Sequence, residues 1–348
     1  MKTLRNIFRI ILLPLSFLYS VAMSARNVLF NMRILGSVKK DVPVISVGNI
    51  TTGGTGKTPV TLWLTEYLIR NDKRVAVISR GYGRKSDGLK LVCDGKSILS
   101  DVASSGDELM MISDELLSRY PGEFVVAACA DRSRAIEFVV REHNAQAVIL
   151  DDAFQHRHIA RDLDIVLVNA EEYERDPLSH LFTVPSGNLR ESRRGLSRAD
   201  VIVWNNKTSV VSIPGFIRRY SDKIIEMSYN SEYFVDSENT IFENIEGKVV
   251  SFCGLADNRS FFAAVRKKCK EVSAEIGFSD HHTYTEADFR RLRNKLPENG
   301  RFVTSQKDFV KVKETGNFAR QNNVCYLKLG IEFITPEKLT KKIDSLIR

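Results

Sequence analysis

Short apolar runs alternate with amphipathic stretches along the chain after residue 40. The runs are rich in valine and isoleucine, as buried strands of parallel sheets are, and the stretches between them have apolar residues at helical spacing. We therefore expect an α/β fold with a largely parallel sheet. The pattern predicts strands at residues 44–47, 75–79, 124–128, 147–151, 165–169 and 201–205, and helices at 59–71, 107–120 and 132–143.

The pattern weakens near residues 214–239, which are polar and give only faint strand signals. From Gly247 the alternation of strands and helices resumes and continues to the end of the chain. We expect a strand-like linker here, followed by a second, smaller α/β domain.

The N-terminal region is both apolar and basic. Residues 10–25 carry no charge, and as a helix they would span about 24 Å, less than the roughly 30 Å hydrocarbon core of a bilayer. Pro14 interrupts this run, and no acidic residue precedes Asp41. Three interpretations are open: a helix in the membrane interface, a short transmembrane anchor and a cleaved signal peptide. The basic residues of the region are Lys2, Arg5, Arg9, Arg26, Arg33, Lys39 and Lys40.

This N-terminal excess accounts for nearly all of the net charge of +8, so the rest of the chain is almost neutral. We therefore expect no general affinity for nucleic acid. The five cysteines are scattered and form no C-x-x-C pair, which indicates a reducing compartment and argues against a structural zinc site.

Residues 44–58 read as an apolar strand that runs into a glycine-rich loop ending in Lys57 and Thr58. This arrangement is typical of a P-loop, in which backbone N–H groups face phosphate oxygens, the lysine reaches the outer phosphates and the hydroxyl binds Mg²⁺. The strict pattern has glycine where this chain has Thr51. The loop predicts binding of ATP or GTP, and this need for cytosolic nucleotide favours the interfacial helix over an exported protein. The loop residues expected to bind nucleotide are Gly53, Gly54, Thr55, Gly56, Lys57 and Thr58.

Two carboxylates, Asp151 and Asp152, end the apolar run at residues 147–151. In P-loop proteins an acid at this place lies close to Mg²⁺, and the P-loop upstream favours that interpretation over an ordinary turn. His156 and His158 follow, but no Cys or His partner at metal-binding spacing accompanies them. Polar contact to nucleotide or substrate and a solvated loop both remain open for the two histidines.

Asp107 opens a predicted helix, where a helix cap is a sufficient explanation. Asp280 and His281 follow a strand end in the C-terminal region, and an Asp–His pair is one way to tune a base. Spacing alone does not connect residues 107 and 281. Arginine-rich loops at residues 79–85 and 185–194 favour anion binding.

These motifs in this order resemble the tetraacyldisaccharide 4′-kinase family of the lipid A pathway in Gram-negative bacteria. The resemblance runs from the apolar N-terminus to Asp308, and family members share Thr or Ser at the position of Thr51. Glycine, proline and glutamate are common in the family where this chain has Ala153, Leu109 and Gln306. The segments that carry the resemblance are V-G-N-I-T-T-G-G-T-G-K-T-P, S-R-G-Y-G-R, G-D-E, D-D-A-F-Q-H, P-S-G-N-L-R-E and F-S-D-H-H-T-Y.

The resemblance implies transfer of the ATP γ-phosphoryl group to the 4′-hydroxyl of tetraacyldisaccharide 1-phosphate, which forms lipid IVA. It implies that Asp107 is the base, supported by His281, and that Lys57 is also catalytic. The Mg²⁺ ligands it implies are Thr58, Asp151 and Asp152. The supporting active-site residues it implies are Glu108, Arg132, Gln155, His156, Arg190 and Glu191.

The partners we expect are the glycolipid substrate and a membrane surface, with the protein a monomer on the cytoplasmic face of the bacterial inner membrane, peripheral or monotopic. We divide the chain into a membrane-associated N-terminal helical segment (1–38), a P-loop kinase core (39–215), a linker that is partly strand (216–246) and a smaller C-terminal α/β domain (247–348). This division places Asp107 and His281 in different domains.

Two other classes of protein contain such a loop. A membrane-associated P-loop switch or partitioning ATPase has a second lysine in its loop, where this chain has Thr52. A non-catalytic nucleotide-binding adaptor would need no base. Turnover on a glycolipid acceptor distinguishes the kinase from both.

Overall fold

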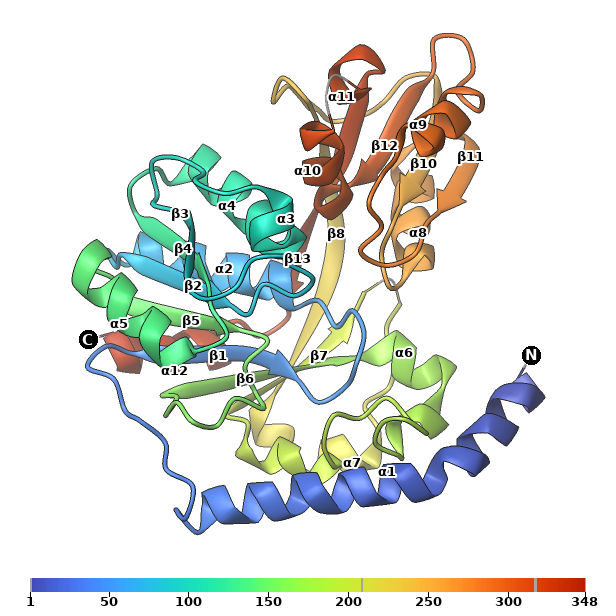
Figure 1. Cartoon of the computed structure of the whole chain (residues 1–348). Coiled ribbons are helices and arrows are strands. Elements are labelled where there is room, and N and C mark those ends of the chain that lie inside the picture. Colours follow the sequence, from blue (N-terminus) through green and yellow to red (C-terminus); the bar gives the residue numbers. More distant parts are fainter. Residues whose placement is uncertain (1, 208, 316–317, 348) are drawn as a thin grey trace. The chain divides into compact units, whose positions relative to one another are not determined.

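The computed structural model describes residues 2–207, 209–315 and 318–347 (Figure 1). The chain divides into two compact units, each built from separate stretches of the sequence. Unit 1 comprises Met1–Arg80, Asp131–Ser228 and Phe333–Arg348, and unit 2 comprises Gly81–Ala130 and Tyr229–Glu332. These boundaries differ from those of the predicted domains.

Unit 1 contains a parallel sheet with the strand order β8-β7-β6-β1-β5-β2. Its central strands are buried along their whole length because helices cover the sheet, which explains their near-continuous apolar sequences. The elements are α1 (Lys2–Asn31), β1 (Val44–Asn49), α2 (Lys57–Arg70), β2 (Val75–Ser79), α5 (Arg132–His143), β5 (Ala147–Asp151), β6 (Leu163–Asn169), α6 (Ala170–Arg175), β7 (Val201–Asn206), α7 (Gly215–Arg218), the start of β8 (Ile224–Asp236) and α12 (Glu337–Ile347), with short 3₁₀ helices at Pro177–His180, Arg193–Arg198 and Ser221–Lys223.

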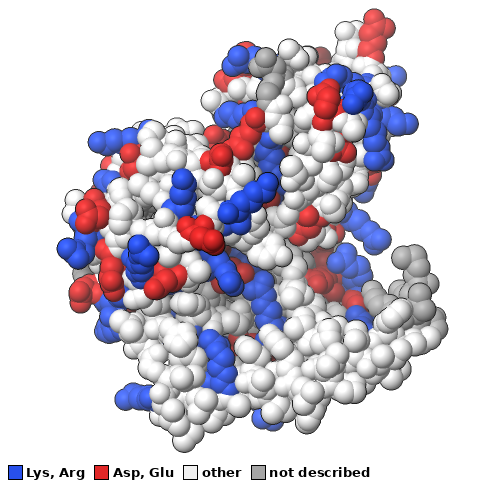
Figure 2. Space-filling view, viewed as in Figure 1, with Lys and Arg blue, Asp and Glu red and all other residues white. Residues whose placement is uncertain are grey.

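Helix α1 is longer than the uncharged run suggested, since it continues through Pro14 to Asn31. It lies along unit 1 and is anchored to that unit near both ends. Arg9 Nη1 donates to Asp176 Oδ1 at 2.9 Å, and Asn27 Nδ2 donates to Glu191 Oε2 at 3.0 Å. Its opposite side is apolar and open: Ile10, Phe17 and Leu18 are 63 to 69% exposed. Figure 2 shows this surface as a band with few charged side chains.

Unit 2 contains parallel strands in the order β11-β10-β12-β13, and two antiparallel pairs, β3 with β4 and β8 with β9. Residues 81–130 belong to this unit because α4 packs against α10, and because Val102 N donates to Glu314 Oε1 at 2.9 Å. The elements are β3 (Lys90–Cys93), α3 (Val102–Ser105), α4 (Asp107–Arg119), β4 (Phe124–Ala128), the rest of β8, β9 (Ile241–Phe242), β10 (Lys248–Cys253), α8 (Asn258–Lys268), β11 (Glu271–Gly277), α9 (Glu286–Arg293), β12 (Arg301–Ser305), α10 (Gln306–Glu314), α11 (Phe318–Gln321) and β13 (Val324–Phe333, whose last residue lies in unit 1).

An aromatic core fixes α9, α10 and α11 against the unit 2 sheet. Phe289 stacks on Phe318 with ring centroids 4.1 Å apart, and Phe252 packs edge-on against Phe302. Phe309 brings α10 into the same cluster with 2% of its surface exposed. The predicted α/β class, with a largely parallel sheet and an apolar N-terminal helix, is confirmed.

Candidate functional site

The glycine-rich loop of unit 1 lies between the end of β1 and the start of α2, as a P-loop does. Gly53 and Gly56 have φ angles of +99° and +88°, in the left-handed region that glycine enters without steric cost. Helix α2 starts at Lys57, and Gly56 before it has no side chain to cap the first N–H groups. Those groups are therefore available to an anion.

Three asparagines at the ends of neighbouring strands hold the loop from the sheet side. Asn205 Nδ2 donates to the Thr55 carbonyl at 2.9 Å, and Asn169 Nδ2 donates to the Gly54 carbonyl at 3.3 Å. Asn49 Nδ2 donates to Thr55 Oγ1 at 2.9 Å. In a trans peptide the N–H points away from the C=O, so carbonyls tied to the sheet turn the following N–H groups outward, where a phosphate would lie.

The two strand-end carboxylates of unit 1 have different surroundings. Asp151 is fully buried, lies beside Val47 of β1 in the sheet, and its Oδ1 accepts a hydrogen bond from Thr61 Oγ1 at 3.2 Å. Asp152 instead has cationic partners. Its Oδ1 lies 3.5 Å from Lys57 Nζ and 2.8 Å from Arg190 Nη1. Burial raises the pKa of Asp152, but these two cations outweigh it and hold the pKa below its ordinary value.

The segment after Asp152 turns back over β1. A Cβ on Gly48 would lie 2.7 Å from the Phe154 Cβ, so only glycine allows this turn to pack on the strand. The turn places Gln155 between two other groups. Its Nε2 donates to the Asn49 carbonyl at 2.8 Å and to Glu191 Oε1 at 2.9 Å.

Glu191 is the centre of a buried polar cluster, with 1% of its surface exposed. Arg198 Nη2 lies 2.8 Å from its Oε2, and Asn27 of α1 donates to the same oxygen. A Cβ on Gly195 would come within 2.5 Å of this carboxylate, so the glycine leaves room for it. The cluster joins α1, the turn after β5 and the loop that carries Arg190.

Burial lowers the pKa of His156 to about 4, with further contributions from Arg132, His158 and other cations. The imidazole is therefore neutral at pH 7. Arg132, at the start of α5, is 4% exposed. Among the described residues no group of three or more His, Cys, Asp or Glu side chains is arranged to hold a metal ion.

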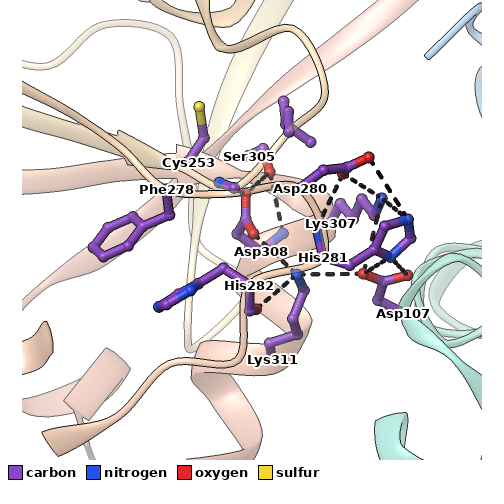
Figure 3. A network of polar contacts seen from close by, with 12 residues as sticks. Asp107, Cys253, Phe278, Asp280, His281, His282, Ser305, Lys307, Asp308 and Lys311 are labelled. Atoms are coloured by element: carbon purple, nitrogen blue, oxygen red, sulfur yellow. Dashed lines mark hydrogen bonds and ion pairs between the residues drawn. The ribbon is translucent and has the colours of Figure 1, made fainter. Parts of the chain in front are cut away.

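In unit 2 the structure joins two residues that sequence spacing did not connect. Asp107 is the first residue of α4, and His281 lies in the loop after β11 (Figure 3). His281 Nδ1 lies 3.1 Å from Asp107 Oδ1 and 3.0 Å from Oδ2. Both residues belong to unit 2, whereas the sequence interpretation assigned them to different domains.

The backbone around this pair is constrained. Gly106, before Asp107, has a φ of +87°, and a Cβ there would lie 3.0 Å from the Tyr82 carbonyl. His281 itself has a φ of +56°, which is unusual for a residue with a side chain. Such strain is maintained only where surrounding contacts require it, and here it aims the imidazole at Asp107.

Two lysines of α10 complete the surroundings of Asp107. Lys311 Nζ lies 3.3 Å and Lys307 Nζ 3.8 Å from Asp107 Oδ2, and Lys307 Nζ also lies 3.8 Å from Glu108 Oε1. Burial raises the pKa of Asp107, but the His281 hydrogen bond and the two lysines outweigh it and lower the pKa to about 2. The hydrogen bond to Asp107 in turn raises the pKa of His281. Asp107 is therefore ionised at neutral pH.

The predicted residues thus form one group in each unit. Unit 1 contains the P-loop and the other nucleotide-, metal- and substrate-directed residues, while Asp107, Glu108 and His281 lie in unit 2. The sequence interpretation missed the three asparagines and Lys311. A signal for the asparagines exists, since each is the last or the second-to-last residue of an apolar strand of the kind that surrounds a P-loop. Lys311 lies one helical turn after Lys307, which places both on one face of α10.

Comparison with known proteins identifies similar chains over nearly the full length. The family model described as Tetraacyldisaccharide-1-P 4′-kinase matches residues 8–348. A tetraacyldisaccharide 4′-kinase of Chlorobium luteolum is 34% identical over 97% of this chain and 98% of its own. One of Chlorobaculum parvum is 36% identical over 97% of this chain and 94% of its own.

A solved structure is also similar over the whole chain. LpxK from Aquifex aeolicus, in complex with ATP, is 28% identical, and the two structures superpose with a TM-score of 0.79. The match covers 98% of this chain and 100% of that one.

Proposed function

The chain belongs to the tetraacyldisaccharide-1-P 4′-kinase family, and from this premise we propose how its residues divide the reaction. The protein is an ATP-dependent kinase that phosphorylates a lipid A precursor at its 4′ position. We propose that the acceptor is tetraacyldisaccharide 1-phosphate and the product lipid IVA. Unit 1 holds the nucleotide and unit 2 supplies the base.

The nucleotide phosphates bind at the P-loop between β1 and α2. The carbonyls of Gly54 and Thr55 are tied to the sheet, and this leaves the N–H groups that follow them to face the phosphates. Lys57 supplies a positive charge for oxygens that become more negative during transfer. The ATP complex of the Aquifex aeolicus relative supports ATP as the nucleotide.

We propose that Mg²⁺ is held by Thr58, Asp151 and Asp152. The donors fit this ion, because Mg²⁺ prefers hard oxygen ligands and usually takes only one or two carboxylates together with phosphate oxygens. Asp151 is buried beside β1, and Thr58 is the second residue of α2, where the phosphate loop ends. Bound there, the ion would neutralise charge on the phosphate oxygens. Asp152 already contacts Lys57 and Arg190, so it also orients both cations.

The pair of Asp107 and His281 is the observation that carries the kinase assignment. Transfer to a hydroxyl needs a group that accepts the hydroxyl proton, whereas a nucleotide switch or an adaptor needs none. Asp107 has a pKa of about 2, so it is an ionised carboxylate at neutral pH. A pKa this low makes it a weak base, so its proposed role rests on its position and not on high basicity. His281 orients it by contacting both carboxylate oxygens. Glu108, next in the chain, is the supporting residue of unit 2.

The supporting residues of unit 1 suit a sugar phosphate. Arg190 offers a guanidinium that can fork onto phosphate, and it is only partly exposed beside Asp152. Arg132 adds a second cation next to the neutral imidazole of His156. Gln155 and Glu191 hold one another and thereby fix the turn that carries His156.

Enzymatic turnover tests this proposal. Purified protein with labelled ATP and a lipid A disaccharide 1-phosphate in detergent is expected to give a product that carries the label at its 4′ position. An acceptor whose 4′ position is already phosphorylated is the matched control and should receive none. ATP hydrolysis without any labelled glycolipid would contradict the assignment.

We further propose that α1 lies in the interface of the cytoplasmic leaflet of the bacterial inner membrane. By length and composition, Asn6–Asn31 could also cross a bilayer. However, its polar contacts to unit 1 extend from Arg9 to Asn27, so one side of the helix is covered by protein over most of its length. A helix in this position buries only its apolar side in lipid.

Charge substitutions on the open side of α1 test this position. Ile10→Glu combined with Phe17→Glu is expected to release the protein from anionic liposomes. Both side chains are more than half exposed in the protein, so in the proposed position they would bury apolar area in lipid, and the substitutions would remove that area. Ile334→Glu is the matched control, since Ile334 is 64% exposed elsewhere in unit 1. Point substitutions are preferable to deletion of α1, because Tyr19 hydrogen-bonds the Arg190 carbonyl at 2.9 Å.

Salt and pH separate the two membrane modes in the same assay. Liposome binding of the unaltered protein should weaken in high salt, because its N-terminal cations contribute about 1 kcal/mol each near an anionic surface. Binding that persists undiminished in high salt and at alkaline pH would support an inserted anchor instead.

A further inference from the structure

Lys311 is buried in unit 2 and uses all of its donors. Its side chain on α10 is 8% exposed, and an ammonium group has three N–H donors and no acceptor. Its Nζ lies 3.3 Å from Asp107 Oδ2, 3.2 Å from Asp308 Oδ1 and 3.2 Å from the His282 carbonyl (Figure 3). Three donors therefore meet three acceptors.

Asp308, which holds Lys311 on the side away from Asp107, is itself fixed in place. Asp308 is fully buried, and its Oδ2 accepts hydrogen bonds from Gly254 N at 2.8 Å and from Ser305 Oγ at 2.6 Å. Ser305 is the N-cap of α10, and Gly254 directly follows β10. Lys311 is thus held by a carboxylate that is itself tied to the sheet of unit 2.

On the near side, Lys311 reaches both parts of the proposed base. It contacts the Asp107 carboxylate directly, and it holds the carbonyl of His282, the residue after His281. The loop and α4 are far apart in sequence, and the Lys311 ammonium contacts both of them within unit 2.

We propose that Lys311 is the positioning residue of the catalytic base: it sets the orientation of the Asp107 carboxylate and the place of the His281 loop without touching substrate. This inference rests on the proposed role of Asp107 as base. It extends that proposal to a residue that acts only through Asp107 and His281.

Lys307 is not equivalent to Lys311. Its Nζ lies 3.3 Å from His281 Nε2 and 3.4 Å from Asp280 Oδ1, but 3.8 Å from Asp107 Oδ2. Within the part of the chain that the structure describes, Lys307 makes no hydrogen bond or ion pair with Asp308, the Ser305 cap or the His282 carbonyl, so it is not tied to the sheet in the way that Lys311 is.

The chemistry of the site requires an ammonium at this position. Without a cation there, the carboxyl groups of Asp107 and Asp308 would lose the ammonium that lies between them, and the side chain of Asp107 would lose its tie to the sheet. An arginine is planar and presents a fork, so it does not match three acceptors arranged around one point. The other charged groups that face Asp107 are His281 and Lys307, and the ring of Tyr284 lies 6.0 Å from Lys311 Nζ.

The test replaces Lys311 and compares kcat with KM. Lys311→Met is expected to lower kcat by roughly 10²-fold, as a small misplacement of a catalytic group does, with the KM values for ATP and glycolipid unchanged. Lys313→Met is the matched control, because Lys313 lies on the same helix, is 43% exposed and contacts Asp114 instead. This control should keep the unaltered kcat. An unchanged kcat in Lys311→Met would overturn the inference.

The same substitution in an Asp107→Asn variant distinguishes a positioning role of Lys311 from general support of the fold. In Asp107→Asn protein, Lys311→Met is expected to lower kcat no further, because the base it positions is already lost. An equal fall in both backgrounds would show a structural role and overturn the inference. If Lys311→Met does not fold, Asp308→Asn makes the same comparison. Asparagine has nearly the shape of aspartate but no charge, so this substitution weakens the ion pair that anchors Lys311.

The same measurements distinguish this inference from the proposed function. If Asp107→Asn alone leaves kcat unchanged, Asp107 is not the base, and both proposals fail. If Asp107→Asn lowers kcat while Lys311→Met does not, the base is supported and only the role of Lys311 is refuted.

Discussion

Lys57→Ala is expected to abolish phosphoryl transfer while leaving the protein folded. Lys57 supplies a fixed positive charge where phosphate oxygens gain negative charge, and loss of one such group costs about 3–4 kcal/mol, which lowers kcat by roughly 10²–10³-fold or more. The fold should survive because the Asp152 carboxylate keeps its contact with Arg190 at 2.8 Å. The rate of labelled phosphate transfer to the glycolipid is the measurement.

Lys73→Ala is the control for this change. Lys73 lies in the turn after α2, in the same unit, and should be neutral to kcat. The thermal unfolding midpoint of both variants should match that of the unaltered protein. A Lys57→Ala protein that retains its kcat would refute the assignment of the P-loop.

Asp107→Ala and His281→Ala should each lower kcat by roughly 10²–10⁴-fold, the usual contribution of a positioned acid or base. Nucleotide affinity should change little, because the P-loop residues belong to unit 1. Asp107 and His281 contact one another directly, so the double variant should be little worse than the poorer single variant. The measurement is kcat for the four proteins of this cycle, with binding of ATP determined separately.

His282→Ala is the matched control for His281→Ala. The ring of His282 faces Asp288, with Nε2 to Oδ2 at 3.1 Å, and stacks on Phe278. Only its backbone carbonyl contacts Lys311, and that carbonyl remains in the variant. Losses that multiply fully in the double variant of Asp107 and His281 would show that the two residues act independently.

Local pattern was enough to predict most of the fold of unit 1. The strands at 75–79 and 147–151 have the predicted bounds, because each is a short run of buried residues with clear turns on both sides. The class and the N-terminal helix are confirmed for the same reason. The P-loop could be recognised because its residues are consecutive in sequence.

The arrangement of unit 2 could not be predicted in this way. Asp107 and His281 are 174 residues apart, and each by itself has an ordinary explanation, a helix cap and a strand-end loop. Their contact depends on how α4 packs against α10, a non-local feature that has no periodicity in sequence. The grouping of residues 81–130 with the C-terminal part follows from the same packing.

Lys311 shows a second limit. Exposed lysines on amphipathic helices are common, so a lysine on α10 attracts no attention until its burial and its three acceptors are seen. Its importance comes from surroundings supplied by α4, by the loop after β11 and by the start of α10 itself. A sequence pattern describes only the last of these.

The way the chain enters and leaves its two units also bears on synthesis by the ribosome. Unit 1 needs the last helix, α12, where Asp344 accepts a hydrogen bond from Tyr67 at 2.7 Å. Unit 2 needs residues up to Glu332. Neither unit is therefore complete until nearly the whole chain has left the ribosome, so a nascent or prematurely terminated chain has neither a finished nucleotide-binding unit nor a finished base. Activity would appear only at the end of translation. For much of synthesis the strands of both units would lack neighbouring strands or covering helices, so the nascent chain would expose apolar surface that chaperones and proteases recognise.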